Sequence, residues 1–349
     1  MLSVMLRLLR ASFPKVQTVV LSQNPHETAQ IHQTSAINRL NLFHIWRALE
    51  HSTLFVLGGG SLLQDSTSQR SLMYYLGLIR WAKQKRRPIF LIGQGIGPLL
   101  RKSSRSSVAS VLAEVDSILV RDRESYEELI ALGVNHDQLI CGRDLALLME
   151  RELHYSSCPN LPSENYFCAV LKDGLTQAQI FNFAKNFDTI HKKLGLLTVL
   201  VPFFQKRDWP TLQTLAQQMN SPVQLVNSVN FASNGVWSLI ANSQFVIGMR
   251  LHSLVFSLNA HVPFIAINYD QKIERFIHRV EAISGVQLPL WDTNGLDKLC
   301  LLGQINQLWT ERESVKSRLK IAQEELSKEA KCGWDQLSSQ MEPYLEETK

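Results

Sequence analysis

Short apolar runs alternate with longer segments of helical periodicity along most of the chain, and this alternation restricts the fold more than any other feature. The apolar runs predict strands at residues 16–21, 52–57, 88–92, 117–121, 167–171, 196–201, 223–226, 245–247 and 263–267. Helical periodicity predicts helices at residues 42–50, 71–85, 108–116, 125–132, 176–194, 209–219, 234–241 and 251–258. Such an alternation favours an α/β fold with parallel, doubly wound sheets.

The length of the chain predicts two domains, because 349 residues exceed what one ordinary hydrophobic core organises. The alternation breaks at residues 155–164, where serine and proline are frequent. We therefore expect Rossmann-like domains at residues 1–155 and 165–305, followed by a charged helical segment at residues 306–349. Ligands of such folds bind beyond the carboxyl ends of strands and often between domains, which predicts a cleft between the two domains.

The composition narrows the class of protein. A net charge of +5 is too small a bias to predict nucleic-acid binding, but it fits an anionic substrate or peripheral contact with an anionic membrane surface. The five cysteines form no CxxC pair and the histidines show no metal-ligand spacing, so we expect reduced thiols, no metal and a cytoplasmic protein. The first ten residues fit a short signal peptide or an amphipathic helix; Arg7 and Arg10 interrupt the apolar run and favour the helix.

One run of basic residues has two interpretations. Lys83, Lys85, Arg86 and Arg87 close the predicted helix 71–85. They either decorate the end of that helix in solvent or hold the protein to anionic lipid by charge. No apolar run in the sequence approaches the length of about 18 residues that a membrane-spanning helix needs.

The strongest candidate site is the Gly-Met-Arg-Leu-His segment at residues 248–252, between a predicted strand and a predicted helix. Gly248 lets the backbone approach a ligand closely, and the helix start offers free N–H groups and about half a positive charge. Arg250 adds a planar fork suited to carboxylate or phosphate, and His252 adds a side chain that moves protons near neutral pH. A surface salt bridge and a partly buried histidine are the alternative. The combination favours a site for a small, multiply charged anion.

A second turn follows the predicted strand 263–267. Tyr269 and Lys272 lie one strand–helix unit after Arg250, so we expect them near it, in contact with the anion or the acceptor. The alternative is an ordinary turn rich in Asn and Asp.

Glycine-rich and polar segments also follow predicted strands of the first domain. Consecutive glycines permit backbone N–H groups to cradle an anion or a sugar hydroxyl, although a tight turn needs glycine as well. The residues Gln94 and Gly95 form either a second wall of the same cleft or a chain reversal, and Arg121 either points into the cleft or joins a solvated charge cluster. The candidate residues of this domain are Gly58, Gly59, Gly60, Ser61, Gln64, Asp65, Gln94, Gly95 and Arg121.

Six segments, in this order and spacing, resemble the polysaccharide pyruvyl transferase family, above all its bacterial cell-wall and exopolysaccharide branch. The resemblance runs roughly from residue 16 to residue 276. The segments are GGGSLLQD at residues 58–65, QGIGP at 94–98, VRD at 120–122, PFFQ at 202–205, MRLH at 249–252 and NYD at 268–270.

The resemblance implies two Rossmann-like halves that face a cleft, as in GT-B glycosyltransferases. It implies transfer of pyruvate from phosphoenolpyruvate to two hydroxyls of one sugar, with a cyclic ketal and phosphate as products and with no metal or nucleotide cofactor. It implies that the acceptor is a glycan or a lipid-linked saccharide bound on the side of the first domain. The expected acceptor-binding residues are Gly58, Gly59, Gly60, Ser61, Gln64, Asp65, Gln94 and Gly95. By the same resemblance Arg250, Leu251 and His252 line the donor site, Arg121 assists from the other half, and His252 is the general acid.

Two departures from the family pattern are visible. Members usually open with a strand and a glycine-rich loop that help to build the acceptor side. Here Met1 falls in what the resemblance makes the helix after that loop, so either the gene start lies further upstream or this copy lacks the segment. Lys172 and Asp173 stand where many members carry an arginine. Two alternatives are therefore kept: a nucleotide-sugar glycosyltransferase of the same architecture, and a truncated, inactive carbohydrate-binding homologue.

Overall fold

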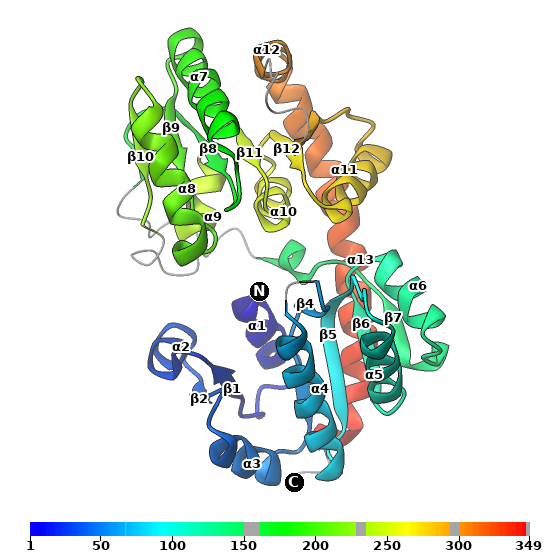
Figure 1. Ribbon diagram of the computed structural model, residues 1–349. Helices are drawn as coiled ribbons and strands as arrows, with labels where there is room; N and C mark the ends of the chain where they lie inside the picture. Colours follow the sequence, from blue (N-terminus) through cyan, green and yellow to red (C-terminus); the bar gives the residue numbers. More distant parts are fainter. Residues whose placement is uncertain (67, 150–160, 228–234, 294–300, 347–349) are drawn as a thin grey trace. The chain divides into compact units, whose positions relative to one another are not determined.

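The computed structural model describes residues 1–66, 68–149, 161–227, 235–293 and 301–346 (Figure 1). The chain forms two compact units, the first comprising Met1–Leu148 and Leu326–Lys349 and the second Met149–Glu325. The first unit thus ends at Leu148 where the sequence predicts residue 155, and the predicted segment 306–349 is shared by the two units. Most of the predicted linker, residues 150–160, lies outside the described residues.

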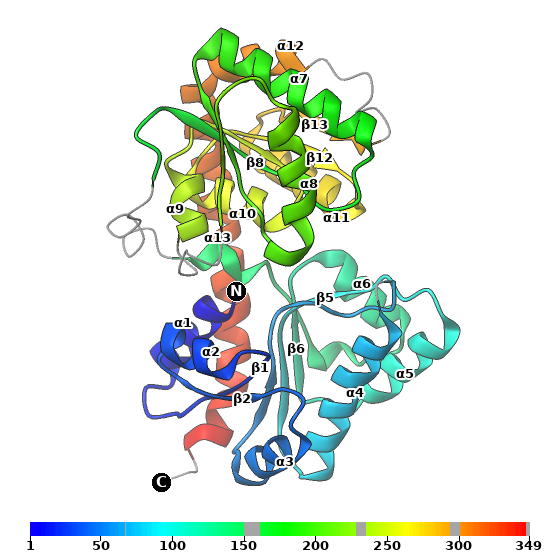
Figure 2. The ribbon, with the colours of Figure 1, turned by 60° about the vertical axis from the view of Figure 1, so that its left-hand side comes forward.

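The first unit contains a parallel sheet in the strand order β3-β5-β6-β7, with β4 paired to β5. Figure 2 shows its strands β5 and β6 side by side. The strands of the first unit are β1 (Val19–Ser22), β2 (Ser35–Asn38), β3 (Phe55–Leu57), β4 (Gly60–Leu63), β5 (Ile89–Ile96), β6 (Ser117–Val120) and β7 (Leu139–Cys141). Its helices are α1 (Leu2–Ser12), α2 (Pro25–His32), α3 (Leu42–His51), α4 (Gln69–Gln84), α5 (Lys102–Leu112) and α6 (Arg123–Ala131), with short 3₁₀ turns η1 (His136–Gln138) and η2 (Leu145–Leu148).

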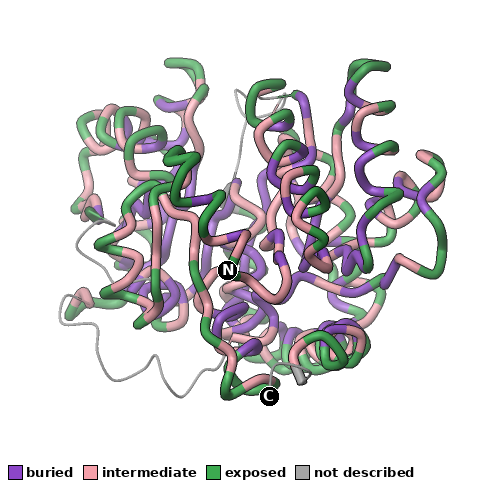
Figure 3. The backbone as a smooth tube through the Cα atoms, turned by 90° about the horizontal axis from the view of Figure 1, so that it is seen from below, coloured by how far each residue is buried: buried purple, intermediate pink, exposed green. Residues whose placement is uncertain are grey.

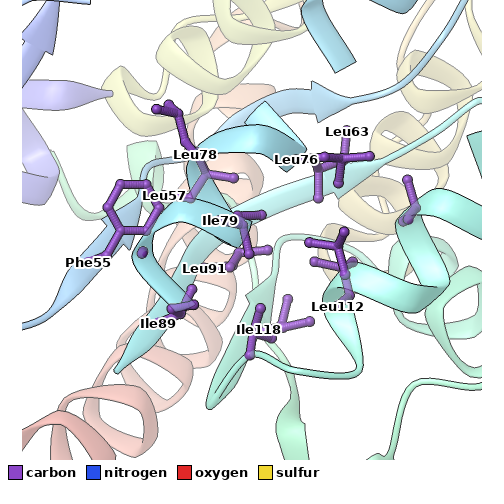
Figure 4. Close-up of a cluster of buried hydrophobic side chains, with 14 of the residues drawn as sticks. Phe55, Leu57, Leu63, Leu76, Leu78, Ile79, Ile89, Leu91, Leu112 and Ile118 are labelled. Atoms are coloured by element: carbon purple, nitrogen blue, oxygen red, sulfur yellow. The ribbon is translucent and has the colours of Figure 1, made fainter. Parts of the chain in front are cut away.

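The core of this unit lies between the sheet and helices α4 and α5 (Figure 4). Leu57, Leu91 and Ile118 come from three neighbouring strands, and Leu76 and Leu112 come from the two helices. Each is at most 5% exposed, and burial of one such side chain contributes about 1.5–3 kcal/mol. The 3.6-residue apolar period of α4 therefore fixes which of its faces meets the sheet.

One predicted strand takes a different place in the fold. The sequence places residues 16–21 in the main sheet, but among the described strands β1 pairs with β2 alone, in a separate two-stranded parallel sheet. Strands inside a doubly wound sheet are buried on both faces. No residue of β1 is buried and Val19 is 52% exposed. The expectation that this strand belongs to the main sheet was therefore wrong.

The second unit contains a parallel sheet of six strands in the order β10-β9-β8-β11-β12-β13. Its strands are β8 (Tyr166–Val170), β9 (Leu197–Leu200), β10 (Val223–Leu225), β11 (Val246–Gly248), β12 (Phe264–Asn268) and β13 (Leu290–Asp292). Its helices are α7 (Gln177–Leu194), α8 (Gln205–Gln218), α9 (Gly235–Ala241), α10 (Leu251–Ala260), α11 (Gln271–Ser284) and α12 (Leu301–Thr310). The two central strands, β8 and β11, are buried at every residue, and buried backbone is drawn in purple in Figure 3.

The last helix, α13 (Arg312–Glu346), belongs to both units, because the division falls between Glu325 and Leu326. Its buried side chains recur every three or four residues, as on one face of a helix. They are Val315, Leu319, Ala322, Leu326, Ala330, Trp334, Leu337 and Met341. In the first unit, Trp334 Nε1 donates to Ser12 Oγ at 3.1 Å and ties this helix to α1.

Candidate functional site

Most of the residues predicted to bind the donor follow strands at the carboxyl end of the second unit's sheet. Strands β8, β11 and β12 are neighbours in the sheet. Because all three are parallel, the segments that follow them meet at one edge. Those segments carry Lys172, Arg250 and Tyr269, which are far apart in the sequence.

Gly248 ends β11, and its lack of a side chain makes room for the helix that follows. A Cβ atom added there would lie 2.6 Å from Ser253 Oγ and 2.7 Å from Leu254 Cδ2. Ser253 Oγ in turn donates to the Arg250 carbonyl at 2.6 Å. The missing side chain therefore lets the first turn of α10 pack against the end of β11. Its approach to a ligand stays a prediction.

The substitution Gly248→Ala is expected to lower the free energy of unfolding by about 2 kcal/mol, because the added methyl overpacks a buried turn. Urea unfolding of the purified protein measures this change. The matched control is Gly303→Ala in α12, where no atom lies within 4 Å of the added methyl, and where alanine stabilises a helix by about 1 kcal/mol. Equal effects of the two substitutions would contradict the packing role of Gly248.

The Arg250 guanidinium is held by acidic partners. Arg250 precedes α10, and its side chain is 11% exposed. Its Nη2 donates to Asp208 Oδ1 and, at 3.3 Å, to Asp173 Oδ1, and its Cζ lies 4.7 Å from the centre of the Phe204 ring. Its Nε is buried and has no hydrogen-bond partner in the part of the chain that the structure describes. One N–H of the guanidinium therefore lacks an acceptor.

Asp208 connects the segments that follow β8, β9 and β11. Its side chain is completely buried. Besides Arg250, it accepts the backbone N–H of Phe204 at 2.9 Å and that of Asp173 at 3.4 Å. In the sequence, Asp208 stands after a predicted strand, where an acid is suited to bind a sugar hydroxyl or to cap a helix. Nothing in the sequence indicates that it pairs with Arg250. Such an acid in the first turn of the helix after a neighbouring strand is the signal that could have found it.

Asp173 sits between two arginines. It accepts from Arg207 Nε at 3.2 Å and Arg207 Nη2 at 3.0 Å, in addition to its bond with Arg250. Burial acts to raise the pKa of the Asp173 carboxyl, but the hydrogen bonds and positive charge of Arg207 outweigh burial and hold that pKa below its ordinary value. Asp173 is therefore ionised at neutral pH.

Two lysines approach the Tyr269 ring. Lys172 Nζ lies 4.9 Å and Lys272 Nζ 5.7 Å from the ring centre. Lys272 also pairs with Asp270 at 2.7 Å, and Asp270 caps α11 by accepting the backbone N–H of Lys272. Tyr269 and Lys272 thus contact each other, together with Lys172, which is not one of the predicted site residues. Their nearness to Arg250 and their contact with the anion or the acceptor stay predictions.

Leu251 and His252 are the first two residues of α10, and both are half-buried. The centroid of the His252 ring is 6.4 Å from that of the Phe256 ring. The centroid of the Phe256 ring is 5.9 Å from that of the Phe203 ring. These aromatic contacts restrict the orientation of the imidazole at the start of the helix. Contact of Leu251 and His252 with a donor stays a prediction.

A second cluster in the first unit lies near the carboxyl ends of β5 and β6, where β4 begins. Arg121 Nη2 donates to Ser61 Oγ at 3.0 Å, and Arg121 is 8% exposed. A Cβ atom on Gly95 would lie 2.6 Å from Arg121 Nη2. Only glycine at this position leaves room for the Arg121 side chain to lie over β5. The structure brings Ser61, Gly95 and Arg121 together in this unit. A part for Arg121 in the donor site of the other half stays a prediction.

The segments predicted as loops here are strands in part. Gly60 and Ser61 lie in β4, and Gln94 and Gly95 lie within β5, where the register shifts by a bulge between Ile92 and Gln94. Gln94 is completely buried, and its Nε2 donates to the carbonyls of Leu57, at 3.1 Å, and of the next residue. The side chain of Gln94 thus fixes the turn after β3.

The other glycines of this turn meet protein atoms. The Gly59 N–H lies 3.4 Å from Met5 Sδ, and a Cβ on Gly58 would lie 3.0 Å from Met5 Cε. Gly58 and Gly59 therefore permit α1 to pack on the turn after β3. Their contact with an acceptor, like that of Gln64, stays a prediction.

Asp65 holds the turn that leads into α5. Its side chain is buried and accepts the backbone N–H of Leu100 at 2.7 Å and of Arg101 at 3.0 Å. Burial acts to raise the pKa of Asp65, but these hydrogen bonds outweigh it and hold the pKa below its ordinary value. The structure shows this local role for Asp65, and a contact with the acceptor stays a prediction.

The substitution Asp65→Ala is expected to lower the free energy of unfolding by about 3 kcal/mol at neutral pH, because two charge-assisted hydrogen bonds are lost. The lowered pKa of Asp65 means that its contribution is complete above the ordinary carboxyl pKa and disappears as the pH falls through the folded-state value. Urea unfolding between neutral and acidic pH checks both statements. Asp137→Ala, at an exposed carboxylate, is the control, with an expected change within about 0.5 kcal/mol.

Among the described residues, no group of three or more His, Cys, Asp or Glu side chains is arranged to hold a metal ion. In the same residues, no helix has the length and apolar character needed to cross a membrane.

The fold is similar to that of solved proteins of GT-B type. The UDP-GlcNAc 2-epimerase from Neisseria meningitidis, solved with UDP-GlcNAc bound, gives a TM-score of 0.63 at 12% identity and covers 97% of this chain and 96% of that one. Anabaena HepE in complex with UDP-glucose also gives 0.63 at 12% identity, over 97% of this chain and 95% of that one. Identities this low show the fold alone, which is parallel α/β, as the sequence predicts.

Sequence relatives are more specific. The amylovoran biosynthesis protein AmsJ of Erwinia amylovora is 23% identical over 211 residues, which are 54% of this chain and 50% of AmsJ. The match thus spans about half the length of this curated relative. The profile of the polysaccharide pyruvyl transferases matches residues 1–271. Because that match covers most of the chain, the protein belongs to the polysaccharide pyruvyl transferase family.

Proposed function

We propose that the protein transfers pyruvate from phosphoenolpyruvate to two hydroxyls of one sugar, in a cell-surface polysaccharide or its lipid-linked precursor. Two C–O bonds form at the enol carbon and the bond from that carbon to the phosphate oxygen breaks. One hydroxyl proton completes the methyl group and the other leaves with phosphate. Membership of the family supports a transferase that acts on polysaccharide, and the amylovoran relative supports an exopolysaccharide.

The observation that carries the proposal is the arrangement around Arg250. Asp208 and Asp173 hold Nη2, while Nε is buried with no acceptor among the described residues. A buried donor without a partner costs about 1–3 kcal/mol, and more when the group is charged. A carboxylate or phosphate oxygen of phosphoenolpyruvate supplies the missing acceptor with a charge-assisted hydrogen bond.

The neighbouring side chains have matching chemistry. Lys172 and Lys272 add two ammonium groups at the same edge of the sheet, beside Tyr269. The start of α10 adds partial positive charge that favours an anion. We assign to His252, at this helix start, the transfer of a proton to the enol methylene or to the leaving phosphate, a step that typically contributes 10²–10⁴-fold to the rate.

The test is incubation of the protein in D₂O with phosphoenolpyruvate and a mixture of bacterial glycans. We expect phosphate release that requires the glycan, acid-labile pyruvate on the sugar, and deuterium in the ketal methyl group. A requirement for a sugar nucleotide, with nucleoside diphosphate as product, would contradict the proposal and favour the glycosyltransferase. Binding of phosphoenolpyruvate or glycan without any turnover would favour the carbohydrate-binding homologue.

A further inference from the structure

Helix α3 of the first unit exposes apolar side chains beside its buried face. Ile45 and Leu49 point into the core and are 1% and 5% exposed. Leu42 is 62%, Phe43 64% and Trp46 40% exposed. Large exposed apolar groups that adjoin one another mark interaction surfaces in soluble proteins.

These apolar side chains form one surface, which we call the α3 surface and define as Leu40, Leu42, Phe43 and Trp46. Leu40 directly precedes the helix cap and is 71% exposed. The Phe43 and Trp46 rings stack with centroids 6.4 Å apart. The aromatic pair and the two leucines therefore come from one continuous segment of chain.

The basic run after α4 lies beside this surface. Lys85 Nζ is 4.7 Å from the centre of the Trp46 ring and pairs with Glu50 of α3, and Arg87 Nη2 donates to the Glu50 carbonyl at 2.8 Å. Figures 1 and 2 show α3 and the end of α4 at the same end of this unit. The charged run is thus brought to the α3 surface by tertiary contacts.

The net positive charge of the chain is concentrated in two segments, one around α3 and one at the end of α4. Residues 39–51 and 80–87 contain seven lysine or arginine residues and one acidic residue, Glu50, which gives a net charge of +6 in a chain whose total is +5. The rest of the chain is therefore close to neutral. Arg47 and Arg86 are exposed, and no acceptor for either side chain is recorded in the described residues.

We propose that the α3 surface and the basic residues beside it bind an anionic membrane surface. Leucine and phenylalanine side chains enter the boundary between headgroups and acyl chains, tryptophan sits at that boundary, and basic side chains reach anionic headgroups. A nucleic acid would use the charge and the rings but would gain nothing from Leu40 and Leu42. The mixture of aliphatic and basic side chains therefore favours lipid.

The proposed contact lies away from the candidate cluster of the first unit. Helix α3 ends just before β3 and the basic run ends just before β5, so the end of α3 and the basic run, with Trp46 beside Lys85, lie at the amino end of the sheet. The cluster of Ser61, Gly95 and Arg121 lies at the carboxyl end. The length of β5, eight residues, separates the two ends by about 25 Å.

The test is flotation of the full chain with vesicles, without substrate, so that the result does not depend on the proposed transferase activity. We expect binding to vesicles of phosphatidylcholine with 30% phosphatidylglycerol (about one lipid in three) and not to phosphatidylcholine alone. Leu42→Ser with Phe43→Ser should weaken binding at least about tenfold. Arg47→Gln with Arg86→Gln should weaken it about 30-fold, because each basic side chain near an anionic surface contributes about fivefold.

Matched controls remove the same groups elsewhere. Arg70→Gln with Lys102→Gln removes two exposed charges near the other end of the sheet, and Phe181→Ser removes a ring that is 54% exposed in α7. Both controls should bind as the unchanged protein does, and circular dichroism should show all variants folded. The proposal would be overturned if the protein did not float with anionic vesicles, or if the control variants lost binding to the same extent. It would also be overturned if the Arg47 and Arg86 substitutions weakened binding while the Leu42 and Phe43 substitutions did not.

Discussion

Replacing Arg250 with lysine is expected to reduce phosphoenolpyruvate-dependent turnover by about 10- to 150-fold. Lysine keeps the positive charge but lacks the planar fork, so it cannot bond Asp208 and Asp173 and also offer the donor that Nε now presents. Each charge-assisted hydrogen bond contributes about 1.5–3 kcal/mol, and at least one is lost. Initial rates of phosphate release with saturating acceptor measure the effect.

The control for this change is Arg207→Lys. Arg207 shares the partner Asp173 with Arg250, but its side chain is 60% exposed where that of Arg250 is 11% exposed. Because exposed ion pairs contribute at most about 1 kcal/mol, the rate should change by less than about fivefold. Retention of the full rate in Arg250→Lys, with a fold intact by circular dichroism, would show that the anion binds elsewhere.

His252→Ala is expected to lower kcat by about 10²–10⁴-fold while the KM for phosphoenolpyruvate stays nearly unchanged. The reason is that general acid catalysis acts in the transition state, and its loss does not remove the cations that bind the donor. His252→Gln should be equally slow, because an amide fills the space without transferring a proton. Steady-state kinetics of the three proteins separate these effects.

The comparison for the histidine is His278→Gln, at an exposed position of α11, which should keep the full rate. If His252→Gln retained a rate within about threefold of the original, His252 would orient the site instead of transferring a proton, since glutamine has no proton to give at neutral pH. If kcat fell only in proportion to the folded fraction, the imidazole would be a structural group.

The fold was predictable wherever a strand is buried on both faces. Runs such as residues 167–171 and 245–247 are apolar throughout, and the structure has β8 and β11 there, buried at every residue. Partly exposed strands carry a weaker pattern. The sequence predicts neither β2 nor β13, and it assigns β1 to the wrong sheet, because short, half-exposed strands lack the continuous apolar run that identifies a central strand.

The candidate site was predictable as a set of turns but not as a set of bonds. Arg250 and Tyr269 stand out because each directly follows an apolar strand, and parallel strands end at a common edge. Asp173 also follows an apolar strand, but nothing in the sequence indicates that Asp173 or Asp208 bonds Arg250. Asp173 and Asp208 have the sequence character of loop and helix-cap residues, and Asp65 and Gln94 turn out to support backbone.

By itself, the sequence determined the parallel α/β architecture and the turns that carry polar chemistry, since both depend on periodicity and on residue type over a few neighbouring positions. Only the tertiary structure decided which side chains share a bond. Arg250 meets Asp208 across 42 residues and Asp173 across 77, and Lys85 meets Glu50 across 35. Contacts of this kind depend on the order of strands in the sheet, which no local pattern encodes.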